Sequence, residues 1–195
     1  MKKTIMVDMD EVITEGGFLH LINDFAGTNY AKEDIKGYYM QDLVPDKKAF
    51  FDYFIKHNQY DYGYLMPDVV EVLKFLQKYF DIYIGTSYII KEIPKECGIN
   101  LVHKHNYLYE KLPFIPVENY IFISNKSLLN CDIKIDDKLD NLKNASIKLL
   151  FTSYHNQDLT DEYLDSCGVK RVNNWLEIKK YLMDVIKNES SSSKK

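Results

Sequence analysis

The sequence predicts an α/β fold, a doubly wound parallel sheet with a small helical cap inserted after the first strand. Short apolar runs, rich in β-branched residues, recur along the chain, and polar residues follow each of them. Amphipathic helical patterns lie between several of these runs. The segment 16–65 interrupts this alternation, because it contains no convincing strand pattern.

The apolar runs are expected to form the strands of the sheet. Most of them are nearly continuous in apolar character, which is typical of strands that are covered on both faces, as in parallel sheets. The predicted strands are Thr4–Val7, Ile82–Gly85, Tyr120–Ile123, Ile133–Ile135 and Ile147–Phe151.

Helices are expected between the strands. Pro67 and Asp68 suit a helix start, and apolar residues then recur at helical spacing as far as Phe80. The ranges 137–145 and 175–186 carry further helical patterns. Because strand and helix alternate here, a parallel sheet with crossover helices is the expected architecture.

The segment 16–65 is expected to form the cap. It has helical patterns at 18–25 and 47–56, and it is rich in tyrosine and phenylalanine. The predicted organisation is an α/β core formed by 1–15 and 66–187, a helical cap formed by 16–65, and a disordered polar tail, 188–195.

Composition limits the range of functions. The net charge is −4 and Arg171 is the only arginine, so a nucleic-acid polymer is not an expected partner. Cys97, Cys131 and Cys167 form no metal-ligand or disulfide pattern and are expected to be reduced thiols. The sequence has no signal-peptide pattern and no apolar run of membrane-spanning length. We therefore expect a cytoplasmic protein without membrane contact, and the sequence leaves open whether it forms a homodimer.

The polar residues that follow the predicted strands form the candidate site. In open α/β sheets, ligands bind beyond the carboxyl ends of the strands, so these residues are expected to lie close together. They are Asp8 and Asp10 after the first strand, Thr86 and Ser87 after the second, Ser124, Asn125 and Lys126 after the third, and Asp136 and Asp137 after the fourth.

This combination of groups suits a magnesium-dependent phosphoryl-transfer centre. An aspartate is ionised at neutral pH and can attack phosphorus without a separate base. A hard cation such as Mg²⁺ would offset the repulsion between that carboxylate and a phosphate dianion. A second aspartate can protonate the leaving oxygen and then activate water. Hydroxyl and ammonium groups can hold the remaining phosphoryl oxygens.

The same motifs resemble those of a known superfamily. "VDMDEV" (7–12), "IGTS" (84–87), "SNK" (124–126) and "IDD" (135–137) stand in the order typical of the haloacid dehalogenase-like (HAD) phosphohydrolases. A closer resemblance, to the 5′(3′)-deoxyribonucleotidase branch, extends from about residue 4 to residue 182. It adds "GGFL" at 16–19, "LLFTSYHNQ" at 149–157 and Trp175.

The resemblance implies a HAD-like, Rossmann-type core and a phosphoric monoester hydrolase. Such an enzyme would convert (deoxy)nucleoside monophosphates to nucleoside and phosphate through an aspartyl-phosphate. The resemblance implies Asp8 as the nucleophile and Asp10 as the acid/base. It implies Thr86, with Ser87 beside it, and Lys126 as phosphate-binding residues.

The resemblance also implies a Mg²⁺ ion as cofactor. Its ligands would be Asp8, the main-chain carbonyl of Asp10 and the pair Asp136 and Asp137, with Asp137 favoured as the direct ligand of that pair. Glu11 is a departure, because much of the superfamily has glycine at this position.

Recognition of a nucleotide base is expected from the cap. Aromatic rings can stack on any base, and the candidates are Tyr38 and Tyr39, followed by Phe18 and Tyr60. His155 is expected to make local hydrogen bonds in its loop, and Trp175 is expected to pack in the core.

Two alternatives stay open at the level of the sequence. A HAD phosphatase for another small phosphomonoester, such as a sugar phosphate, would use the same catalytic groups, and the aromatic cap argues against it only mildly. A non-enzymatic, phospho-accepting signalling module also combines acids, a hydroxyl and a lysine around Mg²⁺. In such modules the acid pair comes first and the lysine last, whereas Lys126 here precedes the pair Asp136 and Asp137.

Overall fold

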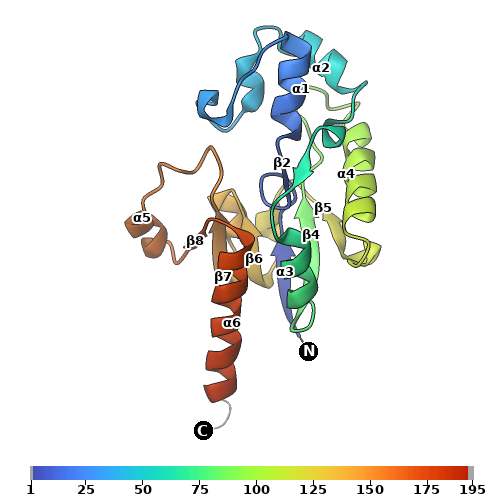
Figure 1. Cartoon of the computed structure of the whole chain (residues 1–195). Coiled ribbons are helices and arrows are strands. Elements are labelled where there is room, and N and C mark those ends of the chain that lie inside the picture. The colour runs from blue at the N-terminus through green and yellow to red at the C-terminus, as the bar shows by residue number, and fades with distance from the viewer. Residues whose placement is uncertain (1, 193–195) are drawn as a thin grey trace.

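The structure, a computed structural model, describes residues 2–192. Its body is a six-stranded sheet in which all neighbouring strands run parallel, in the order β5-β4-β1-β6-β7-β8 (Figure 1). The predicted α/β class with a parallel sheet is thus confirmed. The strands are β1 (Lys3–Val7), β4 (Phe80–Thr86), β5 (Tyr120–Phe122), β6 (Cys131–Asp136), β7 (Ala145–Phe151) and β8 (Lys170–Val172).

Strand β1 lies at the centre of the sheet. Its last residue, Val7, pairs with Ile84 of β4 on one side and with Ile135 of β6 on the other. The chain extends the sheet from β1 through β4 to β5, and then returns to add β6, β7 and β8 on the other side. The strand order therefore reverses beside β1, and such a reversal is where open α/β sheets bind ligands.

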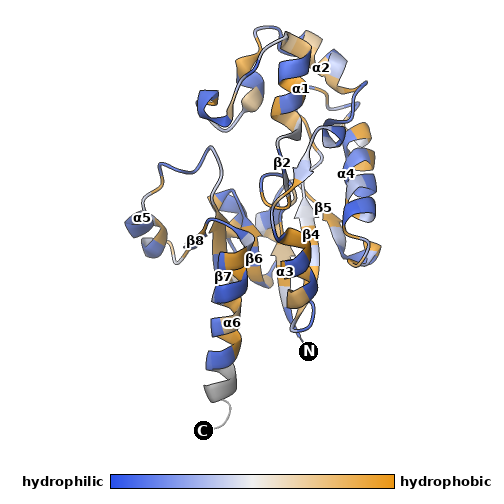
Figure 2. Cartoon of the chain, in the orientation of Figure 1, coloured by the Kyte–Doolittle hydropathy of each residue, from blue (hydrophilic) through white to orange (hydrophobic). Residues whose placement is uncertain are grey.

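Two apolar cores hold the sheet. The larger one joins the strands to α3 (Val69–Leu76), α4 (Gly98–Lys111) and α6 (Trp175–Ser192). It includes Phe151 of β7, whereas the adjacent Leu150 belongs to a smaller core with α5 (Asp161–Ser166). Because neighbouring side chains on a strand point to opposite faces, the two cores lie on opposite sides of the sheet. In Figure 2 much of β7 is hydrophobic, and α3 and α6 each carry a hydrophobic stripe.

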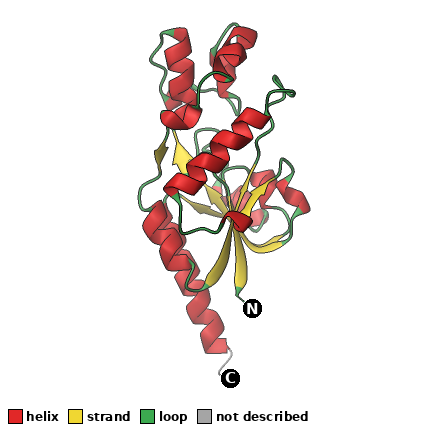
Figure 3. Cartoon of the chain, turned by 90° about the vertical axis from the view of Figure 1, so that its right-hand side faces the viewer, coloured by secondary structure: helices red, strands yellow, loops and turns green. Residues whose placement is uncertain are grey.

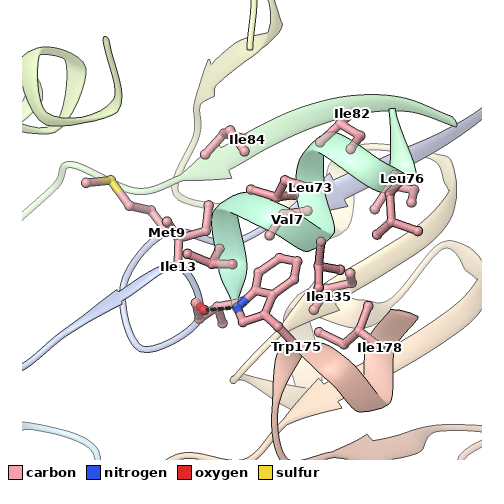
Figure 4. Close-up of a cluster of buried hydrophobic side chains, with 14 of the residues drawn as sticks. Val7, Met9, Ile13, Leu73, Leu76, Ile82, Ile84, Ile135, Trp175 and Ile178 are labelled. Atoms are coloured by element: carbon pink, nitrogen blue, oxygen red, sulfur yellow. Dashed lines mark hydrogen bonds between the residues drawn. The ribbon is translucent and has the colours of Figure 1, made fainter. Parts of the chain in front are cut away.

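Trp175 connects the larger core to the loop after β1. Its ring is buried among Val7, Leu73 and Ile135, as predicted for a core residue (Figure 4). The indole N–H donates to the main-chain carbonyl of Val12 at 2.9 Å. Val12 lies two residues after Asp10, so the start of α6 fixes the loop that carries the first two aspartates.

The segment 16–65 stands over the carboxyl end of the sheet (Figures 1 and 3). Both predicted helical patterns form helices, α1 (Gly17–Ala26) and α2 (Lys47–Phe54). They pack around a separate apolar cluster, which includes Phe50 and Phe54. Ile93, which lies outside the segment, also belongs to this cluster. Three short 3-10 turns complete the segment: η1 (Lys32–Asp34), η2 (Met40–Leu43) and η3 (Gln59–Asp61).

A two-stranded antiparallel ribbon joins this segment to the sheet. The strands are β2 (Thr14–Glu15) and β3 (Tyr64–Leu65). The glycines of the "GGFL" motif follow β2 directly. Gly16 has a φ of 83°, and a Cβ on Gly17 would lie 2.4 Å from the carbonyl oxygen of Gln59. Only glycine fits this turn and this close backbone approach, so the motif is explained by geometry.

Apart from the 3-10 turns, five strands and helices of the described residues were not predicted, namely β2, β3, β8, α4 and α5. Strand β8 is short and contains the charged residues Lys170 and Arg171, so it lacks an apolar run. Helix α4 carries the polar residues Asn100 and Lys104 on its buried side, which obscures its amphipathic pattern.

Two predictions of helix and tail need correction. The range 137–145 contains only a 3-10 turn, η6 (Leu139–Leu142), because the Asp136 carboxylate accepts the main-chain N–H of Lys138 and diverts the backbone from a regular helix. The tail predicted to be disordered from residue 188 is helical as far as Ser192, since neither glycine nor proline interrupts α6. Residues 193–195 lie outside the described residues.

Within residues 2–192, none of the helices has both the length and the apolar character needed to cross a membrane.

Candidate active site

A pocket of about 790 Å³ opens at the carboxyl end of the sheet, under the segment 16–65, and this volume is typical of small-molecule sites. The polar strand ends and several aromatic residues come together in it. Its lining includes Asp8, Asp10, Thr86, Ser87, Ser124, Lys126 and Asp137 from the strand ends, and Phe18, Tyr38, Tyr39 and Tyr60 from the segment above.

Asp8, Asp136 and Asp137 form a buried acidic cluster. One carboxylate oxygen of each lies within 4.8 Å of the others. The cluster follows from the sheet register, because the N–H of Asp8 donates to the carbonyl of Ile135 at 2.9 Å and so aligns the ends of β1 and β6. Burial, followed by repulsion from Asp136, raises the pKa of Asp8 and of Asp137 well above the ordinary value.

Lys126 joins two members of this cluster. It begins the 3-10 turn η5 (Lys126–Leu128), and its buried Nζ lies 2.5 Å from Oδ1 of Asp8 and 2.7 Å from Oδ2 of Asp136. Burial alone would lower the pKa of Lys126, but the charges of Asp136 and Asp8 outweigh it and raise the pKa. A second buried lysine, Lys134, donates to the carbonyl of Lys126 at 2.9 Å and so supports the turn.

The chemistry of this donor set fits a hard divalent cation. Three carboxylates meet, and the ammonium of Lys126 offsets only part of their charge. Mg²⁺ prefers such oxygen ligands. The paired aspartates differ in their partners: Asp136 accepts from Lys126, the Lys138 N–H and Asn141, whereas Asp137 has a 2.7 Å contact with Nε2 of His155. The greater number of protein partners on Asp136 favours Asp137 as the direct ligand of the pair.

The contact of His155 corrects a prediction. The sequence suggested local hydrogen bonds within its loop, but the ring reaches Asp137 instead. The loop after β7 lies beside the end of β6 because the two strands are neighbours, and this brings His155 to the acidic cluster. Burial lowers the pKa of His155, which favours the neutral imidazole.

The side chain of Asp10 lies outside this group of three carboxylates and is held by two other groups. Tyr60 donates its hydroxyl to Oδ1 at 2.8 Å, and the ammonium of Lys104 contacts Oδ2. The side chain of Asp10 nevertheless stays 47% exposed to the pocket. The main-chain carbonyl of Asp10 as a ligand of the cation, which the resemblance implies, stays a prediction.

Two hydroxyls line the pocket at the end of β4. Thr86 is buried, and its Oγ1 accepts from Nζ of Lys104 at 2.8 Å. The hydroxyl of Ser87 lies 3.0 Å from that of Ser124, the strand-end residue after β5. Thr86 and Ser87 thus line the same pocket as Asp8 and Asp137.

Lys104 is the site residue that the strand-end argument missed. It belongs to helix α4, not to a strand end, and no motif contains it. A signal did exist in the sequence: Asn100 and Lys104 are spaced four apart on the same side as the buried Tyr107 and Leu108. Polar residues on the buried stripe of a helix need polar partners, and they point to a site.

Glu11 adopts a backbone conformation that explains why glycine is common at its position. Its φ is 58°, in the left-handed region that glycine enters most easily. Its carboxylate lies at the rim of the pocket, 3.5 Å from Nζ of Lys32, which also contacts Glu15. Burial raises the pKa of Glu11, and the charge of Lys32 opposes that shift.

The four aromatic candidates differ in their surroundings. Tyr38 and Tyr39 are 45% and 50% exposed, with ring centroids 5.1 Å apart. Phe18 lines the pocket but packs edge-on against Phe50, with centroids 5.5 Å apart. Tyr60 is only 6% exposed and packs in the larger core, although it also lines the pocket, so its predicted role in stacking stays a prediction. Its hydroxyl is used to hold Asp10.

Comparisons with known proteins agree with this geometry. A family model described as 5′ nucleotidase, deoxy (pyrimidine), cytosolic type C protein matches residues 2–188. The 5′(3′)-deoxyribonucleotidase of Bacillus subtilis strain 168 is 28% identical over 190 residues, which cover 94% of this chain and 100% of that protein.

Solved structures share the fold at low sequence identity. A HAD family hydrolase from Deinococcus radiodurans, with bound phosphate and sodium, has a TM-score of 0.60 at 12% identity and covers 94% of this chain and 96% of its own. A predicted phosphatase from Clostridium acetobutylicum has a TM-score of 0.56 at 14% identity, with 94% and 99% covered.

The family model spans nearly the whole chain, and the motifs on which the resemblance rested lie together at one end of the sheet. The chain therefore belongs to the cytosolic type C deoxy-(pyrimidine) 5′ nucleotidase family, and is a phosphoric monoester hydrolase with the fold of HAD hydrolases.

Proposed function

We propose that the protein is a Mg²⁺-dependent, cytoplasmic phosphatase that converts small (deoxy)nucleoside monophosphates to nucleoside and phosphate. The observation that carries the proposal is the meeting of Asp8, Lys126 and Asp137 in one pocket beneath exposed tyrosines. The name of the B. subtilis relative, a deoxyribonucleotidase, supports the choice of substrate.

In this proposal Asp8 attacks the phosphorus atom while the bond from phosphorus to the nucleoside oxygen breaks, which leaves a phosphoaspartate. Asp10 gives a proton to the departing oxygen. Asp10 then takes a proton from the water that attacks the phosphoaspartate, so that phosphate leaves and Asp8 is restored. The exposure of Asp10 to the pocket supports this double role.

The phosphoryl oxygens would be held by Lys126, Thr86 and Ser87. Lys126 lies 2.5 Å from the proposed nucleophile, so it can meet the group that Asp8 attacks. Asp8, the main-chain carbonyl of Asp10 and Asp137 would hold Mg²⁺, with Asp136 in support. When bound, the cation offsets the negative charge that substrate and nucleophile bring together.

The base would be recognised by Tyr38 and Tyr39, with Phe18 beside them. A planar base can stack on a half-exposed tyrosine ring, whereas a sugar phosphate offers no such face. In this proposal the segment 16–65 acts as a cap that selects the substrate, and the strand ends perform the same chemistry on any phosphomonoester.

A phosphate-release screen tests the proposal. Its arms are 5′- and 3′-deoxynucleoside monophosphates, ribonucleotides and sugar phosphates, each with and without Mg²⁺. We expect release from nucleotides only with Mg²⁺, and at least tenfold less from ribose 5-phosphate. Equal hydrolysis of ribose 5-phosphate and deoxyuridine monophosphate would favour the sugar-phosphatase alternative.

A further inference from the structure

Lys104 is a buried charge for which the proposed chemistry has no role. Its side chain is 1% exposed and projects from α4 toward the ends of β1 and β4. Removing an ammonium from water is strongly unfavourable unless polar partners compensate for it. A lysine retained at such a position therefore needs partners, and here both of them belong to the pocket.

The ammonium of Lys104 joins two residues from different strands. It contacts Oδ2 of Asp10, and it donates to Oγ1 of Thr86 at 2.8 Å. Its Nζ also lies 5.7 Å from the ring centroid of Tyr60, a distance at which a cation is attracted to an aromatic face. Tyr60 itself donates to Oδ1 of Asp10 at 2.8 Å.

These contacts fix the rotamer of Asp10. Each carboxylate oxygen has a partner on the protein side, while the side chain remains 47% exposed on the pocket side. An acid/base group acts well only when it is held within reach of the proton that it transfers. Without Lys104, the Asp10 carboxylate would keep only the hydroxyl of Tyr60 as a side-chain partner among the contacts described here.

The same ammonium sets the orientation of the Thr86 hydroxyl. A hydroxyl has one proton to donate and two lone pairs that accept. Because Lys104 occupies a lone pair of Oγ1, the Thr86 proton is free to point to another acceptor. Thr86 lines the pocket, so that acceptor can be a phosphoryl oxygen.

We propose that Lys104 is a positioning residue that holds the acid/base Asp10 and the phosphate ligand Thr86 in one arrangement. This inference rests on the proposed function, because it takes the role of Asp10 from there. It adds a fifth element, on a helix, to the four strand-end motifs of the site.

The test compares leaving groups in the variant Lys104→Met, which keeps the length of the side chain and removes the charge. The departure of a nucleoside alkoxide needs a proton from Asp10, whereas p-nitrophenolate leaves without one. We expect kcat/KM for deoxyuridine monophosphate to fall about 10- to 100-fold more than kcat/KM for p-nitrophenyl phosphate. A loss of activity that acts through Thr86 lowers kcat/KM for both substrates by the same factor. It therefore leaves the ratio of the two kcat/KM values unchanged.

The variant Asp10→Asn provides the reference. It should show the same selective loss, and a larger one, because general acid catalysis contributes about 10²- to 10⁴-fold. Equal losses on both substrates in Asp10→Asn would overturn the proposed role of Asp10. A different result would overturn only the inference about Lys104. In that result Asp10→Asn loses activity selectively on deoxyuridine monophosphate, whereas Lys104→Met loses activity equally on both substrates or not at all.

Two further variants separate positioning from folding. Lys111→Met changes a partly exposed lysine on the same helix, which pairs with the adjacent Glu110 and lies 6.0 Å from the ring centroid of Tyr107, and it should leave both substrates unaffected. Lys104→Gln keeps an N–H donor and should lie between wild type and Lys104→Met in its selectivity. The ratio of kcat/KM for the two substrates is measured within one preparation of each variant. An unfolded fraction lowers both values equally and therefore does not change the ratio. Selectivity equal to that of wild type in Lys104→Gln, with reduced activity on both substrates, would count against positioning.

Discussion

The floor of the pocket consists of buried charged and hydroxyl side chains on strand ends, whereas its roof consists of half-exposed tyrosines on irregular segments. We define the floor as Asp8, Thr86, Lys126 and Asp137, and the roof as Tyr38 and Tyr39. Each floor residue is buried and has a hydrogen-bond or ion-pair partner within the protein. The roof rings are about half exposed.

The difference matches a division between chemistry and selection. The floor residues lie at strand ends or soon after them, and contacts within the protein hold each side chain. Such preorganisation is what transition-state stabilisation requires. The roof is attached more lightly: the Tyr154 hydroxyl donates to the carbonyl of Tyr38 at 2.8 Å, and Nζ of Lys138 lies 4.4 Å from its ring centroid. Changes in the floor should therefore affect every phosphomonoester, and changes in the roof only those that carry a base.

The largest effect is expected for Asp8→Asn. The substitution keeps the shape of the side chain and removes the attacking charge, so turnover of every substrate should fall by at least about 10³-fold. Phosphate release from deoxyuridine monophosphate and from p-nitrophenyl phosphate measures it. Retention of a tenth of wild-type turnover on either substrate would remove Asp8 from its proposed role.

Stability provides the control for this variant. Burial and the charge of Asp136 raise the pKa of Asp8, against the opposing charge of Lys126, so the charged form is less favourable in the metal-free fold than in the unfolded chain. The melting temperature of Asp8→Asn in metal-free buffer should therefore be no lower than that of wild type. A loss of activity with unchanged melting then reports chemistry and not unfolding.

Removal of the metal should have the next largest effect. It also acts on the floor, so the turnover of every substrate should be affected. Chelation with EDTA should abolish turnover of all substrates, and Mg²⁺ should restore it. Asp137→Asn replaces an anionic ligand with a neutral one, so the Mg²⁺ concentration for half-maximal activity should rise at least tenfold. Full activity in metal-free buffer would contradict the metal site.

The floor could be predicted largely from the sequence, for a physical reason. A parallel strand covered on both faces must be apolar, so a carboxylate directly after it is conspicuous, as with Asp8 after Val7 and Asp136 after Ile135. The parallel arrangement then brings those ends together. Strand β8 could not be predicted in this way, because it has only three residues and two of them are charged.

Residues that reach the site from elsewhere could not be predicted in this way. Lys104 arrives from a helix, and Tyr60 from a 3-10 turn after the roof. Their contacts with Asp10 depend on how α4 and the segment 16–65 pack, which no spacing rule encodes. Composition marks an aromatic residue such as Tyr60, but it does not reveal whether the face of the ring is free or its hydroxyl is bound to Asp10.

Changes in the roof should have an intermediate and selective effect. Stacking of a base on an aromatic ring contributes roughly 1–3 kcal/mol, so Tyr38→Ala or Tyr39→Ala should lower kcat/KM for nucleotides about 10- to 100-fold. Turnover of p-nitrophenyl phosphate and of ribose 5-phosphate should change less than threefold. An equal loss on all substrates would show that the tyrosines support the floor instead of selecting the base.

The smallest effect is expected at the ion pair between the segment 16–65 and the residues that precede it. Lys32 lies in η1, and its Nζ lies 3.5 Å from the Glu11 carboxylate and also contacts Glu15. Its side chain is about one-third exposed, and pairs with such exposure contribute about 0–1 kcal/mol. Lys32→Met should therefore change KM by at most about fivefold and leave kcat unchanged. Because salt screens exposed charges, the difference in KM from wild type should shrink as NaCl rises from about 0.05 to 0.5 M.

Lys48→Met, which removes an exposed pair with Asp52 on α2, is the matched control and should have no effect on KM. A fall in kcat beyond tenfold in Lys32→Met would instead place this ion pair in the chemistry, and the division between a catalytic floor and a selective roof would need a third part.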